Sequence, residues 1–280
     1  MQSLTPAESN LDQNLWRLKR WFSEYSSCIV AFSAGVDSSL LCYVARQALG
    51  EMAHAVTSVS PAFAESERQE TKTIANEIGI DLIEVIQNDL GTPGYTKNEV
   101  TRCYFCRSNL ALAIKPIAER LSVDVCVDGT HADDLKSPRP GVKALRENDF
   151  RAPLAELGFG KEQIRAMARH VGLSNWNRPS EACLSSRVAY GQIISLETLQ
   201  RIEKAENFVR SITRAGTVRV RTIGTGAIVE VEKEKVCEAI KNSKRISKEL
   251  ENLGYQKVEI DPDGYASGKM LELFVKSMEK

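Results

Sequence analysis

Seven residues near the N-terminus, Ser33-Ala34-Gly35-Val36-Asp37-Ser38-Ser39, have the composition of a phosphate-binding loop. They follow an apolar run, Cys28 to Phe32, that predicts a buried strand, and they precede residues with helical spacing. A strand that turns into a helix through small and hydroxylated residues leaves backbone N–H groups free at the helix start, where the helix dipole also favours an anion. We therefore predict a phosphate site, although an ordinary turn capped by Ser33 or Asp37 would have the same composition.

A second polar group, Asp128-Gly129-Thr130-His131-Ala132-Asp133-Asp134, directly follows another predicted strand, Val123 to Val127. A glycine such as Gly129 at a strand end lets the backbone approach a ligand closely, and carboxylates such as Asp133 suit magnesium or a ribose hydroxyl. The alternative is a glycine turn with an aspartate cap. Because both groups follow strands of one predicted parallel sheet, we expect them at the same edge of that sheet.

The strongest metal-binding pattern is Cys103-Tyr104-Phe105-Cys106, combined with Cys183 further along the chain. A C-x-x-C pair brings two thiolates to one metal centre, and a third cysteine can complete a trio. Three thiolates suit zinc with a fourth ligand such as His131, or a [4Fe-4S] cluster with one open iron. The lack of a second C-x-x-C weakens the zinc interpretation.

Three unrelated buried thiols are the remaining alternative, because free cysteine packs as a small hydrophobe. Against it, Cys103 and Cys106 are predicted to lie in a polar loop flanked by arginines. The other four cysteines fall in predicted strands and helices, and we expect them in the core: Cys28, Cys42, Cys126 and Cys237.

Arg219 and Arg221 alternate with Val218 and Val220, so a strand would turn both guanidinium groups to one face. Two adjacent guanidinium groups suit a phosphate. The alternative, which the pattern alone favours, is a solvated strand face.

The elements that must position these residues follow an alternating strand and helix pattern in the first two thirds of the chain. This alternation predicts an α/β fold with a doubly wound parallel sheet, in which ligands lie at the carboxyl ends of the strands. Pro116 is expected to kink or split the helix Asn109 to Leu121, and residues 128–159 are expected to be rich in loops. The predicted strands are Cys28 to Phe32, His54 to Val59, Asp81 to Ile86 and Val123 to Val127.

The pattern changes beyond Tyr190 and predicts a small α+β domain. We place the boundary so that residues 1–205 form the first domain and residues 206–280 the second. Beyond Tyr190 we expect a helix from Leu196 to Ser211, a helical stretch over 233–253 and three strands: Thr217 to Thr222, Ala227 to Glu232 and Lys257 to Ile260.

Composition narrows the functional classes. The 280 residues include 37 basic and 37 acidic side chains, so no global field favours nucleic acid or an anionic membrane. No apolar run is long enough to span a bilayer, and the polar N-terminus has no hydrophobic signal core. Seven cysteines without an export signal indicate reduced thiols, and we expect a cytoplasmic protein.

The first loop resembles the PP-loop of ATP pyrophosphatases, usually Ser-Gly-Gly-x-Asp-Ser, with Ala34 in place of the first glycine. Alanine tolerates positive φ poorly, so the PP-loop interpretation requires a helical or extended backbone at Ala34, and we expect one there. The order of the motifs resembles that of the LarE family of ATP-dependent sulfur transferases, which serve synthesis of the nickel-pincer nucleotide cofactor. The resemblance covers nearly the whole chain and rests on AFS-x-GVDSS, RCYFC, DGTHADD, RPGVKAL, NW-x-RPSEACLSSR, VRVR and the tail GYASGKM.

This resemblance implies that a carboxylate of pyridinium-3,5-biscarboxylate mononucleotide is adenylated by ATP with Mg²⁺, and that sulfur then displaces AMP to give a thiocarboxylate. It implies the PP-loop ATP pyrophosphatase fold and a homo-oligomer. Some members give up the sulfur of their own cysteine, at a position matching Cys183, whereas members with RCYxC and a third cysteine resemble carriers of a [4Fe-4S] cluster. This sequence resembles the cluster type.

Residue roles carry over by motif. The ATP site would comprise Ser33, Gly35, Val36, Asp37, Ser38, Ser39, Gly129 and Asp133, and Asp37 is also a candidate magnesium ligand. Asp37 and Cys183 would be catalytic, and the cluster would be held by Cys103, Cys106 and Cys183. The candidates for binding the substrate or pyrophosphate are Arg139, Lys143, Arg187, Arg219, Arg221, Glu206 and Glu230.

Three other functions compete with this one. A tRNA thiolase would share the loop and the cysteine trio, but should show a basic RNA-binding surface, which the balanced charge does not indicate. An ammonia-using synthetase would not need the trio. A nucleotide-sensing or metal-storage protein would show no steady release of pyrophosphate.

Overall fold

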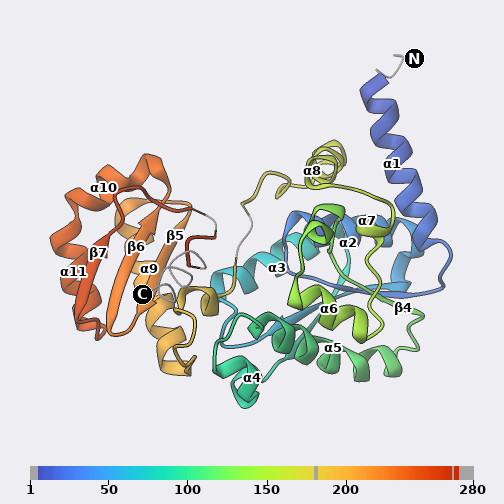
Figure 1. Cartoon of the computed structure of the whole chain (residues 1–280). Coiled ribbons are helices and arrows are strands. Elements are labelled where there is room, and N and C mark those ends of the chain that lie inside the picture. Colours follow the sequence, from blue (N-terminus) through green and yellow to red (C-terminus); the bar gives the residue numbers. More distant parts are fainter. Residues whose placement is uncertain (1–5, 180–181, 267, 271–280) are drawn as a thin grey trace. The chain divides into compact units, whose positions relative to one another are not determined.

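Four parallel strands form the central sheet of this computed structural model, in the order β3-β2-β1-β4. Figure 1 shows the chain, with β4 of this sheet and the strands β5, β6 and β7 of a second sheet labelled. Strand β1 pairs with β2 from Cys28 opposite Ala53, and with β4 from Cys28 opposite Val125. The predicted doubly wound α/β sheet is therefore confirmed. The strand bounds are β1 Cys28–Ala31, β2 Ala53–Val59, β3 Asp81–Ile86 and β4 Val125–Val127.

Alternate residues of β1 pack on opposite faces of this sheet, as the pleat of a strand requires. Cys28 and Val30 join the cluster formed with helices α1, α2, α3 and α8, whereas Ile29 and Ala31 join the cluster that includes residues of α5 and α6. Helices thus cover both faces. Their bounds are α1 Pro6–Phe22, α2 Val36–Leu49, α3 Glu65–Ile78, α5 Arg102–Arg120, α6 Pro140–Glu147, α7 Pro153–Glu156 and α8 Lys161–His170.

A second sheet has the order β5-β6-β7, with β5 antiparallel and β7 parallel to β6. Its valines, among them Val218 and Val229, pack with buried residues of α9, α10 and α11. The small α+β region therefore has its own core. Its elements are β5 Val218–Ile223, β6 Gly226–Val231, β7 Lys257–Ile260, α9 Leu196–Thr213, α10 Val236–Lys241 and α11 Ser243–Asn252.

The structure describes residues 6–179, 182–266 and 268–270, and Ser180 and Glu181 of the Cys183 motif lie outside this set. Contacts divide the described chain into two units. The first comprises residues 6–88 and 103–179, and the second comprises 89–102 and 182–270. A short helix, α4 (Pro93–Thr96), therefore belongs to the second unit although it precedes α5 in sequence. The domain boundary after residue 205 stays a prediction.

Two local expectations need correction. Helix α5 is continuous from Arg102 to Arg120, so it is not split at Pro116; residues before the proline, such as the buried Ile114, pack it against the sheet, and a kink there stays a prediction. The expected loop at 128–159 contains α6 and α7, and each begins with a proline at a position where a helix has no need of an amide donor.

The remaining short elements are 3₁₀ turns, and they connect the longer ones. No helix among the described residues has the length and apolar character needed to cross a bilayer. The turns are η1 Gly50–Met52, η2 Asp89–Gly91, η3 Ala132–Lys136, η4 Leu184–Arg187 and η5 Lys233–Lys235.

Candidate functional site

The predicted phosphate loop lies between β1 and α2, and its conformation fits that role. Gly35 is extended (φ −70°, ψ 152°) and caps α2 without a side-chain hydrogen bond. The Ser38 hydroxyl donates to the Gly35 carbonyl at 3.1 Å and accepts from the Ser33 amide at 3.3 Å, which closes the loop on itself. The first amides of a helix have no acceptor within the helix, so Val36 and Asp37 offer theirs to an anion.

Ala34 has a left-handed backbone, with φ of 54°, so the expected helical or extended conformation was wrong. This is the position at which PP-loops usually carry glycine. The methyl group of Ala34 is fully buried in the core of the first unit. Tertiary packing therefore holds a conformation that costs an L-residue about 1–2 kcal/mol.

Gly129 lies directly against the start of α2. A Cβ atom built on Gly129 would lie 3.2 Å from Asp37 Cβ and 3.3 Å from the Ser38 amide nitrogen. Any larger residue would push the two loops apart. The structure thus brings Gly129 to the phosphate loop, as the motif order predicted.

Asp37 and Asp133 are linked through a residue that the sequence analysis missed, Lys161 at the start of α8. The Lys161 ammonium contacts both carboxylate oxygens of Asp37, at 2.8 and 2.6 Å. The Lys161 backbone amide donates to Asp133 Oδ2 at 2.8 Å. A single lysine at the start of an amphipathic helix does not stand out in one sequence as a site residue. Only the fold reveals that Lys161 contacts Asp37.

The carboxylates of the second loop titrate differently because their surroundings differ. A hydrogen bond from the Lys136 ammonium, with another from the Lys161 amide, holds the pKa of Asp133 below its ordinary value. Burial raises the pKa of Asp128, and hydrogen bonds from the Thr130 hydroxyl and amide oppose that rise. Asp133 therefore keeps its negative charge near the phosphate loop, whereas Asp128 is the more easily protonated of the two.

Cys103 and Cys106 lie in the first turns of helix α5, so the predicted loop position was wrong. Residues three apart share one helix face, and neither cysteine forms a disulfide; Cys103 is exposed and Cys106 is half-buried. Gln87 donates its side-chain amide to the Cys106 carbonyl at 2.9 Å and to its sulfur at 3.7 Å. A Cβ atom on Gly141 would lie 3.8 Å from Cys103 Cβ, so a glycine leaves room there.

The third thiol, Cys183, is also free and exposed, and it lies in the second unit immediately before η4. Within the residues that the structure describes, no three His, Cys, Asp or Glu side chains form a ready metal-binding group. Within the first unit, the thiols of Cys103 and Cys106 on one face of α5 have the spacing of two ligands to one metal centre.

The four cysteines predicted in the core differ in their exposure. Cys28 and Cys42 are fully buried; burial and the neighbouring Cys126 thiol raise the pKa of Cys28 to about 12. Cys126 is only half-buried, and burial raises its pKa to about 11. Cys237 is exposed on α10, so its assignment to the core was wrong.

Buried charges gather in the second unit. Arg187 and Glu206 form a bidentate pair with 2.8 and 3.2 Å contacts, and Arg221 lies 3.0 Å from Glu230. Arg219 is 1% exposed, and its guanidinium lies over the Tyr265 ring at 5.1 Å. The alternative of a solvated strand face for Arg219 and Arg221 is therefore wrong.

The buried arginines of the second unit also contact the backbone around Cys183. Arg187 donates to the Cys183 carbonyl at 2.9 Å, and Arg221 donates to the Ser186 carbonyl at 3.2 Å. Arginines predicted to bind substrate thus lie beside the cysteine predicted to act in sulfur transfer. Tyr265 is a neighbour that the sequence analysis did not single out, although it lies in the quoted tail motif.

Arg139 and Lys143 are exposed residues of the first unit. Arg139 forms an ion pair with Asp134 at 2.6 Å, and Lys143 lies 3.7 Å from Glu147. Both basic side chains are therefore already paired with carboxylates. Their predicted contact with substrate or pyrophosphate stays a prediction.

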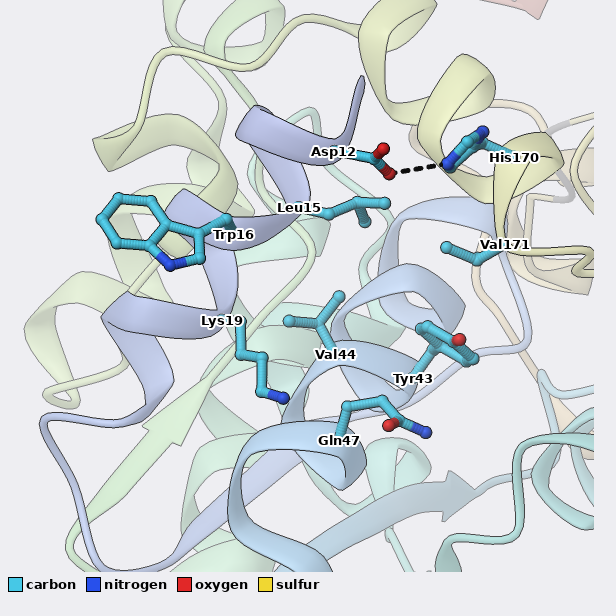
Figure 2. A pocket seen from close by; sticks show the side chains of 9 residues that line it. All are labelled: Asp12, Leu15, Trp16, Lys19, Tyr43, Val44, Gln47, His170 and Val171. Atoms are coloured by element: carbon cyan, nitrogen blue, oxygen red, sulfur yellow. Dashed lines mark hydrogen bonds and ion pairs between the residues drawn. The ribbon is translucent and has the colours of Figure 1, made fainter. Parts of the chain in front are cut away.

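An open pocket of about 550 Å³ lies elsewhere on the first unit, among α1, α2 and the end of α8 (Figure 2). His170 Nε2 and Asp12 Oδ1 are within hydrogen-bond distance at 2.8 Å across part of it, and Trp16 and Tyr43 contribute aromatic rings to the lining. The residues predicted to bind ATP do not line this pocket.

The parallel sheet and the serine-rich loop after β1 define a PP-loop α/β protein. No family model matches the chain. The uncharacterized protein slr1717 of Synechocystis sp. is 36% identical over 268 residues, which cover 95% of this chain and the whole of that protein. Pyridinium-3,5-bisthiocarboxylic acid mononucleotide synthase of Lactiplantibacillus plantarum is 29% identical over 249 residues, or 89% of this chain and 90% of that enzyme.

A more distant relative matches a shorter stretch of the chain. One subunit of the glutamine-hydrolyzing GMP synthase of Methanocaldococcus jannaschii is 29% identical over 175 residues, which cover 58% of this chain and 55% of that subunit. The chain therefore belongs to one family with the Synechocystis protein, and it shares the PP-loop α/β fold with the GMP synthase subunit.

Proposed function

We propose that the protein is an ATP-dependent sulfur transferase acting on pyridinium-3,5-biscarboxylate mononucleotide in nickel-pincer cofactor synthesis. The likeness to pyridinium-3,5-bisthiocarboxylic acid mononucleotide synthase over 89% of the chain supports this substrate. The observation that carries the proposal is the close packing of Gly129 on Asp37 and Ser38, because it builds a phosphate cradle from both predicted loops.

The first step is adenylation of the acceptor carboxylate. A carboxylate oxygen attacks the α-phosphorus of ATP, the bond to the β-phosphate oxygen breaks, and pyrophosphate leaves. Amides at the start of α2 and the hydroxyls of Ser33, Ser38 and Ser39 bind the phosphates, and holding both substrates in line lowers the entropic barrier. Mg²⁺ would be held by Asp37, with Asp133 as a second carboxylate at the same loops.

The second step replaces AMP by sulfur. Cys103, Cys106 and Cys183 would hold a [4Fe-4S] cluster, which when bound supplies a sulfide as the nucleophile. Arg219 and Arg221 are proposed to bind the phosphate of the mononucleotide, and Arg187, paired with Glu206, is a further candidate for binding the substrate or pyrophosphate. Arg221 already shares its charge with Glu230, so the substrate phosphate would join an existing ion pair.

Product analysis tests the adenylation step. With ATP, Mg²⁺ and the pyridinium substrate, the protein should form AMP and pyrophosphate, and formation of ADP and phosphate would exclude the PP-loop chemistry. Asp37→Ala should abolish turnover and leave the fold intact, because Asp37 is partly exposed at a helix start. The matched control, Asp12→Ala at the remote pocket, should retain turnover.

Iron and sulfide analysis of anaerobically purified protein tests the cluster. Any one of the three cysteines changed to alanine should remove the visible charge-transfer absorption, whereas Cys42→Ala should not. Stoichiometric zinc would contradict the cluster. A sacrificial mechanism would leave Cys183 as dehydroalanine after one turnover, about 34 Da lighter, whereas the cluster mechanism leaves Cys183 intact through several turnovers.

A further inference from the structure

The ammonium group of Lys161 is bound to the carboxylate of Asp37, the residue proposed above as the magnesium ligand. Its nitrogen lies 2.8 and 2.6 Å from the two oxygens of Asp37. Both oxygens of this candidate ligand are thus already neutralised by a cation. Mg²⁺ binds through carboxylate oxygens and nucleotide phosphates together, so it must compete with the ammonium for Asp37.

The main chain of Lys161 is held independently of its ammonium. The Lys161 amide donates to Asp133 Oδ2 at 2.8 Å, and Gly160 packs so tightly on Asp133 that a Cβ atom would lie 3.0 Å from the same oxygen. The start of α8 is therefore fixed by Asp133. The side chain can leave Asp37 without moving the helix, because it is a flexible stem with a charged end.

The Asp37–Lys161 pair is also poorly suited to a purely structural role. The side chains are 22% and 30% exposed, and partly exposed ion pairs contribute little to stability. An ammonium beside a loop of free amides is instead a good ligand for phosphate oxygens. The same group that blocks the metal site in the absence of nucleotide can contribute to nucleotide binding.

We propose that Lys161 exchanges partners when ATP binds: its ammonium leaves Asp37 for the β- and γ-phosphates, and Mg²⁺ takes its place on Asp37. This inference rests on the proposed function, because it assumes that the loop binds ATP. It assigns Lys161 a double role. Lys161 binds phosphate in the complex and competes with the metal in the free protein.

The test compares the affinity of the full-length protein for ATP with Mg²⁺ and with EDTA, by calorimetry, in the absence of the acceptor. Lys161→Gln should weaken ATP binding in EDTA about 10-fold, because a charge-assisted hydrogen bond is lost. The factor by which Mg²⁺ strengthens ATP binding should rise about 5-fold above the wild-type factor, because no ammonium then competes for Asp37. Lys161→Arg, which keeps the cation, should retain most of the affinity in EDTA.

A matched control is Lys72→Gln, which removes a partly exposed lysine of the first unit that lies 3.6 Å from Glu84, outside both loops of the proposed ATP site. It should leave both affinities unchanged. If Lys161→Gln weakens ATP binding equally with and without Mg²⁺, or not at all, the exchange is wrong and the proposed function stands. If the wild-type protein binds no ATP, both proposals are wrong.

Discussion

The side-chain amide of Asn175 donates a hydrogen bond to the backbone carbonyl of Ala34 at 2.7 Å. The same nitrogen contacts the Ser39 hydroxyl at 2.8 Å, so one residue from beyond α8 spans both ends of the phosphate loop. Asn175 is 4% exposed, and its own oxygen has no hydrogen-bond partner in the described structure. The strained backbone at Ala34 is thus held by a contact 141 residues away in sequence.

Replacing Asn175 by alanine should loosen the phosphate loop. The change leaves the buried Ala34 carbonyl without this donor, which should lower the free energy of unfolding by about 1–3 kcal/mol. ATP affinity should fall as well. Urea denaturation and calorimetry measure the two effects, and Asn207→Ala, at an exposed position of α9, should change neither.

Substitutions at Ala34 should separate backbone strain from packing. Ala34→Gly relieves about 1–2 kcal/mol of strain, but it loses about 0.8 kcal/mol of methyl burial and increases unfolded-state entropy, so net stability should change by less than about 1 kcal/mol. Ala34→Val adds volume and a β-branched residue at positive φ, and should destabilise by about 2 kcal/mol or more. Equal stability of the two variants in thermal denaturation would show that the backbone at residue 34 is not strained.

The sheet could be predicted from sequence because its signals are local. The apolar strands, the alternation with helices and the glycine that ends α3 each depend on a few neighbouring residues. The left-handed Ala34 could not be predicted, since alanine disfavours that conformation and the stabilising partner, Asn175, is distant. Lys161 was missed for the same reason: its contact with Asp37 exists only once α8 packs on α2.

Burial of charge is likewise a tertiary property. Alternating arginines and valines indicate a strand with two different faces, but they do not reveal that both faces are covered. The arginines can be buried because the buried carboxylates of Glu206 and Glu230 supply the opposite charges that buried cations require. Cys103 and Cys106 were misplaced for a different reason. Their polar, arginine-rich neighbours suggested a loop, although α5 already begins at Arg102.

The Arg187–Glu206 pair should be essential to the stability of the second unit. Glu206→Gln leaves a buried guanidinium without a counter-charge and should cost about 3–5 kcal/mol. On the same helix, Glu197 pairs with Arg201 but is 80% exposed, so Glu197→Gln should cost less than about 1 kcal/mol. Similar losses in denaturant titrations of the two variants would contradict the importance of burial.

Alkylation should sort the cysteines by exposure and pKa. In cluster-free protein near neutral pH, iodoacetamide should label the exposed thiols of Cys103, Cys183 and Cys237 first. Cys28 should stay unlabelled, because its thiolate forms only as the pH approaches a pKa of about 12. After iron and sulfide are added, peptide mass spectrometry should find Cys103 and Cys183 protected and Cys237 still reactive, and equal labelling of all three would argue against the cluster.

The assignment of residues 89–102 to the second unit gives the protein a discontinuous domain, with consequences during synthesis. Tyr95 and Asn98 are buried there, and Asn98 donates its side-chain amide to the Ala189 carbonyl at 2.8 Å. At translation rates of about 5–20 residues per second, Asn98 leaves the ribosome about 10 s before Ala189 exists. The nascent chain must therefore carry an unfinished piece of one domain while the other completes its sheet, and a fragment that starts at residue 182 would lack that piece permanently.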